Sequence, residues 1–325
     1  NITNKEYVYS QYDSTVRTNT VIGPGSSAAV VRLKDSDKAL SISTDCNGRY
    51  VYLDPRKGGM IAVAESARNV VCSGGLPLAI TNCLNFGNPQ DPEIYWQFRE
   101  AILGMGEACR AFDTPVTGGN VSFYNESNLG AVYPTPVIGM VGLLEDSSKH
   151  MDISYKKPGD TIVAIGAING ELGGSEYLKQ CCGKVEGPIP GVDLILESSL
   201  HKICLRLISD GVINSAHDIS DGGLSVNIAE SICSGAPGLG AKISISRKLR
   251  EDQILFGETQ GVIIVTLDAK DLHKVALAAQ EYNVYTQTIG SVTDSGKLEM
   301  NESISIAREE LEKAYFNTLS DIMAD

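Results

Sequence analysis

The sequence predicts an α+β protein with two domains, each built from a sheet backed by helices. The chain has 325 residues, and a domain commonly holds about 150 residues. Strand-like and helix-like segments alternate irregularly, with short neighbouring strands that fit antiparallel pairs, which argues against one doubly wound sheet. A Lys-Pro-Gly-Asp break at residues 157–160 lies near the middle of the chain, so we expect domains at residues 1–156 and 157–325.

The expected elements of the first half follow from the spacing of apolar residues. Strands are expected where short β-branched or apolar runs occur, at residues 30–33, 39–44, 76–84 and 136–144. A helix is expected from Gly59, since apolar residues then recur at steps of three and four, and the Gly74-Gly75 pair ends it. A second helix has one apolar face, formed by Phe98, Ile102, Met105, Cys109 and Phe112.

The second half repeats the same kinds of segment. Strands are expected at residues 161–165, 241–245 and 261–267, followed by a strand pair within residues 285–300. Helices are expected at residues 194–209, 223–232, 271–281 and 306–319. The second domain therefore combines a sheet with helices, as the first does.

Composition excludes several classes of function. The chain has 27 Lys and Arg against 40 Asp and Glu, a net charge of −13, which argues against nucleic acid because a phosphate backbone needs clustered cations. A small phosphorylated ligand stays compatible, since carboxylates can hold it through Mg²⁺. No run of 18 apolar residues predicts a membrane span. The eight scattered cysteines form no zinc pattern and indicate buried thiols in a reducing cytoplasm.

The common catalytic motifs are absent from the sequence, including the P-loop, the dinucleotide fingerprint, H-E-x-x-H and G-x-S-x-G. Four polar clusters stand in apolar surroundings instead. They are residues 44–47, the i, i+4 pair Glu65 and Asn69, residues 118–122, and residues 216–223. The two glycines of the third cluster predict a tight turn whose backbone can approach an anion. Carboxylate, amide and hydroxyl oxygens in the others suit Mg²⁺.

Each cluster also has a purely structural explanation. Asp218, Ser220 and Asp221 precede an expected helix and could cap its N-terminus. Glu65 and Asn69 could lie on a solvated helix face, and the glycines of residues 118–122 could form an ordinary turn. Spacing alone therefore supports a Mg²⁺–phosphate site only weakly.

Longer strings are more specific. They are NTVIGPGS at 19–26, TDCNGRYVYLDP at 44–55, CLNFGNP at 83–89, TGGNVS at 117–122 and HDISDGGL at 217–224. Through them the whole chain resembles phosphoribosylformylglycinamidine synthase, specifically the C-terminal half of its large synthetase subunit. The resemblance implies the aminoimidazole ribonucleotide synthetase-like architecture. In it an N-terminal α+β domain contributes strands to a dimeric or pseudo-dimeric barrel and a C-terminal α/β domain follows, and the polar start of the chain is linker-like.

The resemblance also implies a function in de novo purine biosynthesis. The family is an ATP-dependent C–N ligase that converts formylglycinamide ribonucleotide and glutamine-derived ammonia to the amidine. ATP activates the substrate amide as an iminophosphate, ammonia displaces phosphate, and Mg²⁺ shields the polyphosphate. Implied partners are the N-terminal half of the same subunit, a glutaminase subunit and a small accessory subunit. The family's catalytic histidines lie in that N-terminal half, so no catalytic residue is assigned here and we expect the chain alone to be inactive.

Binding residues carry over from the resemblance position by position. Gly119 matches a glycine whose backbone approaches ATP, Asn120 an asparagine ligand of Mg²⁺, and Ser122 a serine that touches the nucleotide substrate. Asn82 stands where the family has an ATP-contacting aspartate. An amide there keeps the hydrogen bonding and loses the charge.

A second, auxiliary nucleotide–Mg²⁺ site is known in the long single-chain members of the family. Glu65, Asn69 and Asp218 match its metal ligands and Ser220 its ATP contact. Ser27 replaces a further aspartate ligand of that site.

Two alternatives stay open, of which the second belongs to a different class of function. A free-standing relative, such as aminoimidazole ribonucleotide synthetase or a small-molecule kinase, would carry a complete nucleotide site of its own. A non-catalytic scaffold would bind a nucleotide structurally and dock other subunits. We expect the isolated chain to form a homodimer, because barrel strands without their partner leave apolar edges uncovered.

Overall fold

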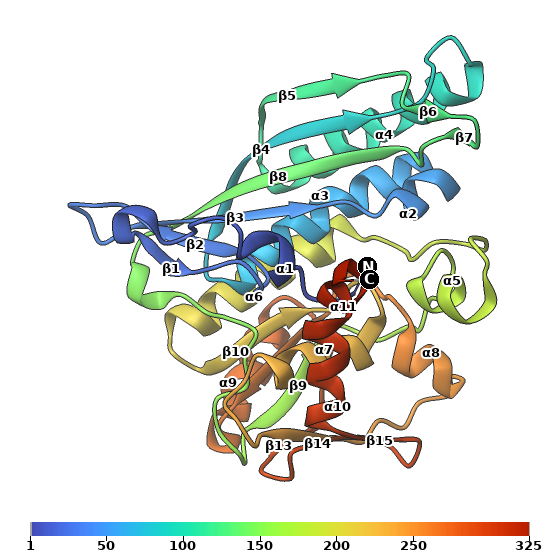
Figure 1. Ribbon diagram of the computed structural model, residues 1–325. Helices are drawn as coiled ribbons and strands as arrows, with labels where there is room; N and C mark the ends of the chain where they lie inside the picture. The colour runs from blue at the N-terminus through green and yellow to red at the C-terminus, as the bar shows by residue number, and fades with distance from the viewer. Residues whose placement is uncertain (1, 325) are drawn as a thin grey trace.

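The first half of the protein forms an open six-stranded sheet. The computed structural model describes residues 2–324, and the strand order of this sheet is β1-β2-β3-β8-β4-β5 (Figure 1). The strands are β1 (Thr20–Ile22), β2 (Ala29–Arg32), β3 (Ala39–Asp45), β4 (Leu76–Asn85), β5 (Val116–Ser122) and β8 (Thr135–Leu144). The helices are α1 (Glu6–Tyr9), α2 (Gly48–Leu53), α3 (Pro55–Cys72) and α4 (Pro92–Phe112). A small hairpin adds β6 (Glu126–Ser127) and β7 (Gly130–Ala131).

The second half forms a seven-stranded sheet of order β10-β12-β9-β13-β11-β14-β15. Its strands are β9 (Thr161–Ile165), β10 (Ile213–Asp218), β11 (Gly240–Ile243), β12 (Ile263–Leu267), β13 (Thr286–Thr293), β14 (Lys297–Met300) and β15 (Ile304–Ala307). Its helices are α5 (Glu176–Cys182), α6 (Leu194–Ser209), α7 (Gly223–Cys233), α8 (Glu251–Phe256), α9 (Leu272–Glu281), α10 (Arg308–Glu312) and α11 (Thr318–Ala324), with the π-helical segment η4 (Lys313–Asn317) between the last two. The α+β class with two sheets is thereby confirmed.

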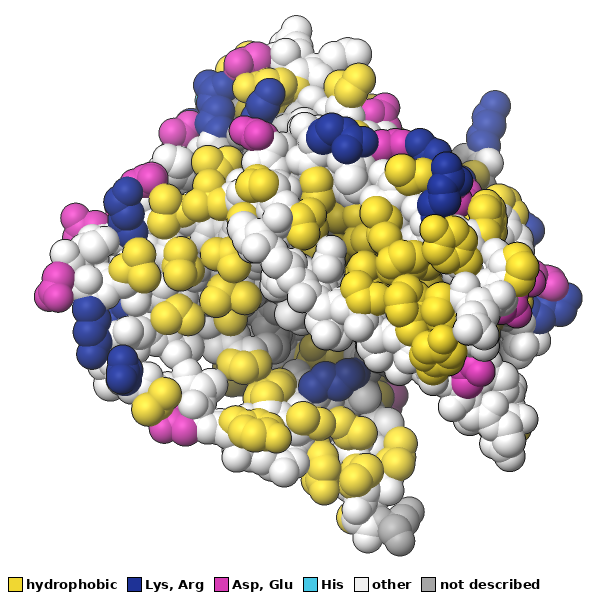
Figure 2. Space-filling model, turned by 90° about the horizontal axis from the view of Figure 1, so that it is seen from above, with side chains coloured by type: hydrophobic (Ala, Val, Ile, Leu, Met, Phe, Trp, Pro, Cys, Tyr) yellow, Lys and Arg dark blue, Asp and Glu magenta, His cyan; other side chains and the backbone are white. Residues whose placement is uncertain are grey.

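The two sheets are covered differently. Along β8 buried and half-exposed residues alternate, and the buried set, including Ile138 and Met140, packs with α3 and α4. The opposite face of the first sheet stays open, and Figure 2 shows hydrophobic side chains gathered on the side of the molecule seen from above. In β9, by contrast, Ile162 and Ala164 join one core while Val163 and Ile165 join another. The second sheet is therefore buried on both faces.

Helix α3 joins the two halves of the molecule. Its residues Val71 and Cys72 belong to the same core cluster as α6 and strands of the second sheet. The helix begins at Pro55, four residues before the predicted start, because Asp54 caps it by accepting a hydrogen bond from the Lys57 amide. Gly59 lies inside the helix, where a Cβ would stand 2.5 Å from the Ala101 carbonyl of α4. This glycine serves close helix packing, and reading it as a helix start was wrong.

Other departures have local causes. The expected strand pair within residues 285–300 is wrong, because β13 and β14 flank β11 and do not pair with each other. The final helix begins at Arg308, since Ile306 is paired to Leu298 in β15. The polar start of the chain is held against the C-terminal helical segment, because the backbone N–H of Asn4 donates a hydrogen bond to the Tyr315 carbonyl oxygen at 2.9 Å.

The cysteines are less uniformly buried than expected. All eight are free. The expectation of burial is wrong for three of them, since Cys83, Cys181 and Cys182 are exposed. Within residues 2–324, no helix combines the length and the apolar character that crossing a membrane requires.

Candidate functional site

The predicted nucleotide-binding residues of the first half meet on two adjacent strands. β4 and β5 run parallel, and their register places Asn82 opposite Gly119 and Cys83 opposite Asn120. A Cβ on Gly119 would lie 2.2 Å from the Asn82 side-chain oxygen Oδ1 and 2.6 Å from the Asn82 carbonyl oxygen. Glycine is therefore required here by the close approach of Asn82.

The expected tight turn at residues 118–122 is wrong. These residues form the edge strand β5, most of which is exposed, and neither Gly118 nor Gly119 has a positive φ. The small side chains leave the backbone of the sheet edge accessible without a turn. A glycine pair in sequence has the same appearance whether it bends the chain or lets a neighbour approach.

The strand pleat separates these residues onto two faces. Successive side chains of a strand point to opposite sides, so Asn82 and its neighbour Cys83 diverge. The Asn120 amide nitrogen Nδ2 lies 3.8 Å from Cys83 Sγ on the open face, while Asn82 packs with Gly119 on the helix side. Ser122 Oγ lies 3.2 Å from Asn125 Oδ1. The edge thus presents amide and hydroxyl groups on both faces, in reach of a ligand that wraps around it.

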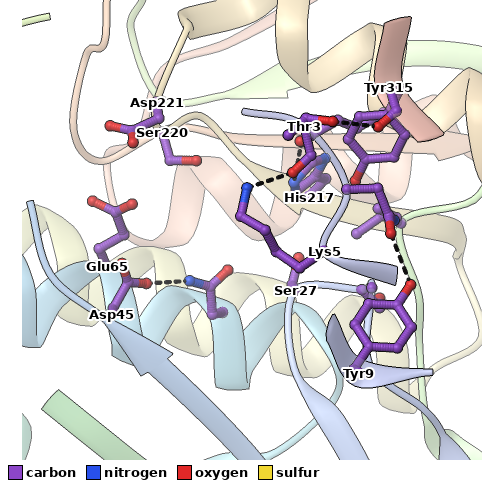
Figure 3. Close-up of a pocket in the computed structure, with 16 residues that line it drawn as sticks. Thr3, Lys5, Tyr9, Ser27, Asp45, Glu65, His217, Ser220, Asp221 and Tyr315 are labelled. Atoms are coloured by element: carbon purple, nitrogen blue, oxygen red, sulfur yellow. Dashed lines mark hydrogen bonds and ion pairs between the residues drawn. The ribbon is translucent and has the colours of Figure 1, made fainter. Parts of the chain in front are cut away.

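Three of the four residues predicted for the auxiliary site meet at a separate cavity of about 420 Å³. Glu65, Asn69 and Ser220 all line it, and Figure 3 shows Glu65 and Ser220 among the side chains around it. Contributions come from the N-terminal segment, the end of β3, α3, the turn after β10, α7 and the C-terminal helix. The full lining is Thr3, Asn4, Lys5, Tyr9, Gly25, Ser26, Ser27, Asp45, Glu65, Asn69, Ile153, His217, Ser220, Asp221, Glu230 and Tyr315. We call this the acidic cavity.

The helix α3 presents its i, i+4 pair to this cavity. Asn69 Nδ2 donates to Asp45 Oδ2 at 2.6 Å, and Glu65 lies one turn earlier on the same face. Ser27, at the position of the family's aspartate, also lines the cavity. The alternative of a solvated face is wrong for Glu65, which is 9% exposed.

Asp218 is not part of the cavity lining. Its side chain is buried behind it, where Oδ2 lies 3.2 Å from Arg68 Nε. Arg68 is fully buried and also contacts Glu197 Oε1 at 2.5 Å and Gln260 Oε1 at 2.6 Å. Sequence reasoning missed this arginine, although it lies between Glu65 and Asn69 on the predicted helix. Nothing in its spacing marks it, because its partners come from distant segments.

The alternative that Asp218 or Ser220 caps the following helix is wrong. Gly222 occupies the N-cap position of α7, and no side chain caps that helix. Asp221 bonds elsewhere: its Oδ1 accepts from Asn47 Nδ2 at 2.9 Å and lies 3.6 Å from Arg49 Nη2.

Burial and mutual repulsion keep the carboxyl groups of the cavity protonated to unusually high pH. Burial, reinforced by the charges of Asp218 and Asp221, raises the pKa of Asp45 to about 8. Burial likewise raises the pKa of Glu230 to about 8 and that of Glu65 well above its usual range. Burial lowers the pKa of Lys5, against the pull of Glu230 and Asp221. Such crowding favours a bound cation, because a positive charge relieves the repulsion.

The donor set suits Mg²⁺ in kind. Glu65, Asp45, Asn69 and Ser220 offer oxygen ligands, which this ion prefers. Within residues 2–324, however, no three His, Cys, Asp or Glu side chains already stand close enough together to ligate one ion. A metal would therefore draw on amide, hydroxyl and ligand oxygens as well as carboxylates.

Comparison with known proteins places the chain in a family. Two family models match in succession: the N-terminal domain of AIR synthase related protein at residues 25–144 and its C-terminal domain at residues 157–302. The chain is 47% identical over 326 residues to the phosphoribosylformylglycinamidine synthase subunit PurL of Alkaliphilus metalliredigens, covering 99% of this chain and 44% of that protein. It is 51% identical over 292 residues to the PurL of Thermoanaerobacter sp., covering 90% and 40%.

A solved structure shows the same fold. The Thermotoga maritima PurL complexed with FGAR superposes with a TM-score of 0.74 at 18% identity, covering 89% of this chain and 48% of that one. The chain spans less than half the length of the curated relatives reported above. With both domain models matched in order and about half of all residues shared with PurL subunits, the chain belongs to the AIR synthase related family, in its phosphoribosylformylglycinamidine synthase branch.

Proposed function

We propose that this chain is the C-terminal half of the large subunit of phosphoribosylformylglycinamidine synthase, with domains at residues 1–156 and 157–325. It would take part in converting formylglycinamide ribonucleotide, ATP and glutamine-derived ammonia to formylglycinamidine ribonucleotide in the cytoplasm. The observation that carries the proposal is the pairing of Asn82 with Gly119 at the edge of an open sheet, in a chain 47% identical to PurL. Its eight free cysteines accord with a reducing compartment.

The edge strand would bind ATP and substrate. Asn82 and the exposed backbone at Gly119 would hold ATP through hydrogen bonds, Asn120 would ligate Mg²⁺, and Ser122 Oγ would hydrogen-bond the nucleotide substrate. Mg²⁺ supplies charge neutralisation for the polyphosphate when it is bound. The residues of this chain therefore bind and orient, and proton transfers would fall to groups of the missing half.

The open face of the first sheet would receive that missing half. Ile42 is 40% exposed and Leu76 is 55% exposed, and both stand on strands of this sheet. The barrel that the family resemblance implies needs a second sheet on this face, since the sheet of this chain is open. When the chain is alone, a second copy would cover it and give a homodimer. The glutaminase and the small accessory subunit are further proposed partners.

The acidic cavity would hold the auxiliary nucleotide. Glu65 and Asn69 would ligate its Mg²⁺, and Ser220 would contact its phosphates. Asp218 would contribute indirectly, through its buried ion pair with Arg68. This role is structural, so the cavity itself would carry out no chemistry.

Reconstitution tests the ligase proposal. The chain is mixed with the N-terminal half of a PurL subunit, a glutaminase, ATP, Mg²⁺ and formylglycinamide ribonucleotide, and the amidine is measured. We expect product only with both halves, and a higher substrate KM for Ser122→Ala with little change in kcat. Product from this chain alone would favour a free-standing enzyme, and an unchanged KM would refute the role of Ser122.

A further inference from the structure

A second cavity, of about 400 Å³, lies between α7 and the C-terminal helical segment. Its walls are almost entirely apolar, with Val226 and Ala229 from α7, Leu298 and Ile306 from the sheet, and Leu311 from α10. Of the residues that the structure describes, no Lys, Arg or His lines it. An apolar cavity holds water poorly, and one of only about 150 Å³ already accepts benzene.

One polar side chain in this apolar cavity lacks a partner. Ser225, in the first turn of α7, is 6% exposed and lines the cavity. Its Oγ makes no hydrogen bond to any of the described residues. A buried hydroxyl without a partner is costly, and such groups in folded proteins usually have an explanation. A ligand in the cavity would supply the missing bond.

The opposite wall is irregular. The C-terminal helix changes to the π-helical segment Lys313–Asn317, and Ala314 and Tyr315 of this segment line the cavity. Short π-helical insertions are rare and occur frequently at functional sites. The π-helical insertion, the apolar walls and the unpartnered hydroxyl of Ser225 therefore all lie at the same cavity.

We propose that this cavity binds an uncharged molecule of one or two fused rings that carries a single hydrogen-bonding group directed at Ser225 Oγ. The volume falls within the usual range of small-molecule pockets. Among residues 2–324 no cationic side chain lines the cavity, which argues against a phosphate, and the hydroxyl can either donate or accept. None of the residues assigned to ATP, Mg²⁺ or substrate lines this cavity, so the inference is independent of the ligase proposal.

A molecule bound in the apolar cavity would also contact residues that line the acidic cavity. Thr3, Glu230 and Tyr315 line both. A ring seated against Tyr315 and Glu230 fixes two walls of the neighbouring cavity. The bound molecule would therefore contact residues that also form walls of the acidic cavity.

The test uses indole and its ring-matched analogue indene, which lacks the N–H donor. Binding to the full chain is titrated by ligand-observed NMR. We expect both to bind, with Ser225→Ala weakening indole about tenfold, the value of one hydrogen bond, and leaving indene unchanged. Ala229→Leu, which fills the cavity, should abolish both. The matched control is Ala276→Leu, in a cavity of about 380 Å³ elsewhere, which should change neither.

Three results would overturn the inference. They are no binding of either ring at millimolar concentration to folded protein, indole binding that Ser225→Ala leaves intact, and binding that survives cavity filling. Circular dichroism checks that each variant is folded. If Ala229→Leu does not fold, Ala314→Leu fills the same space from the opposite wall and takes its place.

Discussion

Arg68→Met should be among the most damaging single substitutions in this protein. The guanidinium is fully buried, and all three of its partners, Glu197, Asp218 and Gln260, come from segments more than 100 residues away in sequence. Methionine has similar length and no charge, so the packing is roughly kept while two carboxylates lose their cation. The substitution therefore isolates the electrostatic contribution of the network.

The magnitude follows from the burial of the partners. Glu197 and Asp218 each have 1% of their side chain exposed, and removing one partner of a buried ion pair costs about 3–5 kcal/mol. That is a large share of a typical unfolding free energy of about 5–15 kcal/mol. Burial raises the pKa of Glu197 to about 7 even though Arg68 lowers it. Without Arg68 this pKa rises further, so protonation relieves the variant at low pH and its loss of stability grows as the pH increases.

Urea denaturation followed by circular dichroism measures this effect at pH 5.5 and pH 8. The matched control is Arg99→Met, which removes an arginine with 61% of its side chain exposed from its ion pair with Glu100 and should change stability little. Mg²⁺-dependent stabilisation should weaken only in Arg68→Met, since Asp218 then loses its anchor. A loss equal to that of the control, or one independent of pH, would refute the reasoning.

Three further substitutions test other parts of the structure. Gly119→Ala places a Cβ 2.2 Å from Asn82 Oδ1, so it should displace the edge strand and abolish reconstituted ligase activity; full activity would contradict the close approach. Glu230 has a folded-state pKa of about 8 against an ordinary 4.5, so its contribution to stability is complete below pH 4.5 and lost as the pH rises through 8. Glu230→Gln should flatten the fall in unfolding free energy over that range in urea titrations, and an unchanged slope would contradict the assignment. Ile42→Glu should shift the isolated chain from dimer to monomer in sedimentation, whereas Ile195→Glu, at an 82% exposed position, should not; a dimer that persists would show that the open sheet face is not the interface.

Local sequence patterns account for most elements of this fold, but not for the contacts between them. Apolar spacing correctly predicted most strands and helices, because the periods of 2 and 3.6 residues are local properties. The helix start at Gly59 and the turn predicted from the glycines of residues 118–122 were wrong, because glycine at these positions serves a close approach between elements. Apolar spacing also failed at β13 and β14, since strand order is set by long-range pairing.

The candidate sites divide in the same way. Sequence strings were enough to determine the family, and the alternation of strand-like and helix-like segments predicted the α+β class. The strings also name Glu65, Asn69, Asn82 and Gly119 as predicted site residues, because residue identity is what they record. Only the tertiary structure decided that Glu65, Asn69 and Ser220 share one cavity, that Asp218 stands behind it on Arg68, and that Asn82 and Asn120 face opposite sides of their sheet. Those relations depend on contacts between segments far apart in the chain, and the raised pKa values of the carboxyl groups depend on burial. Neither the contacts nor the burial exist until the chain has folded.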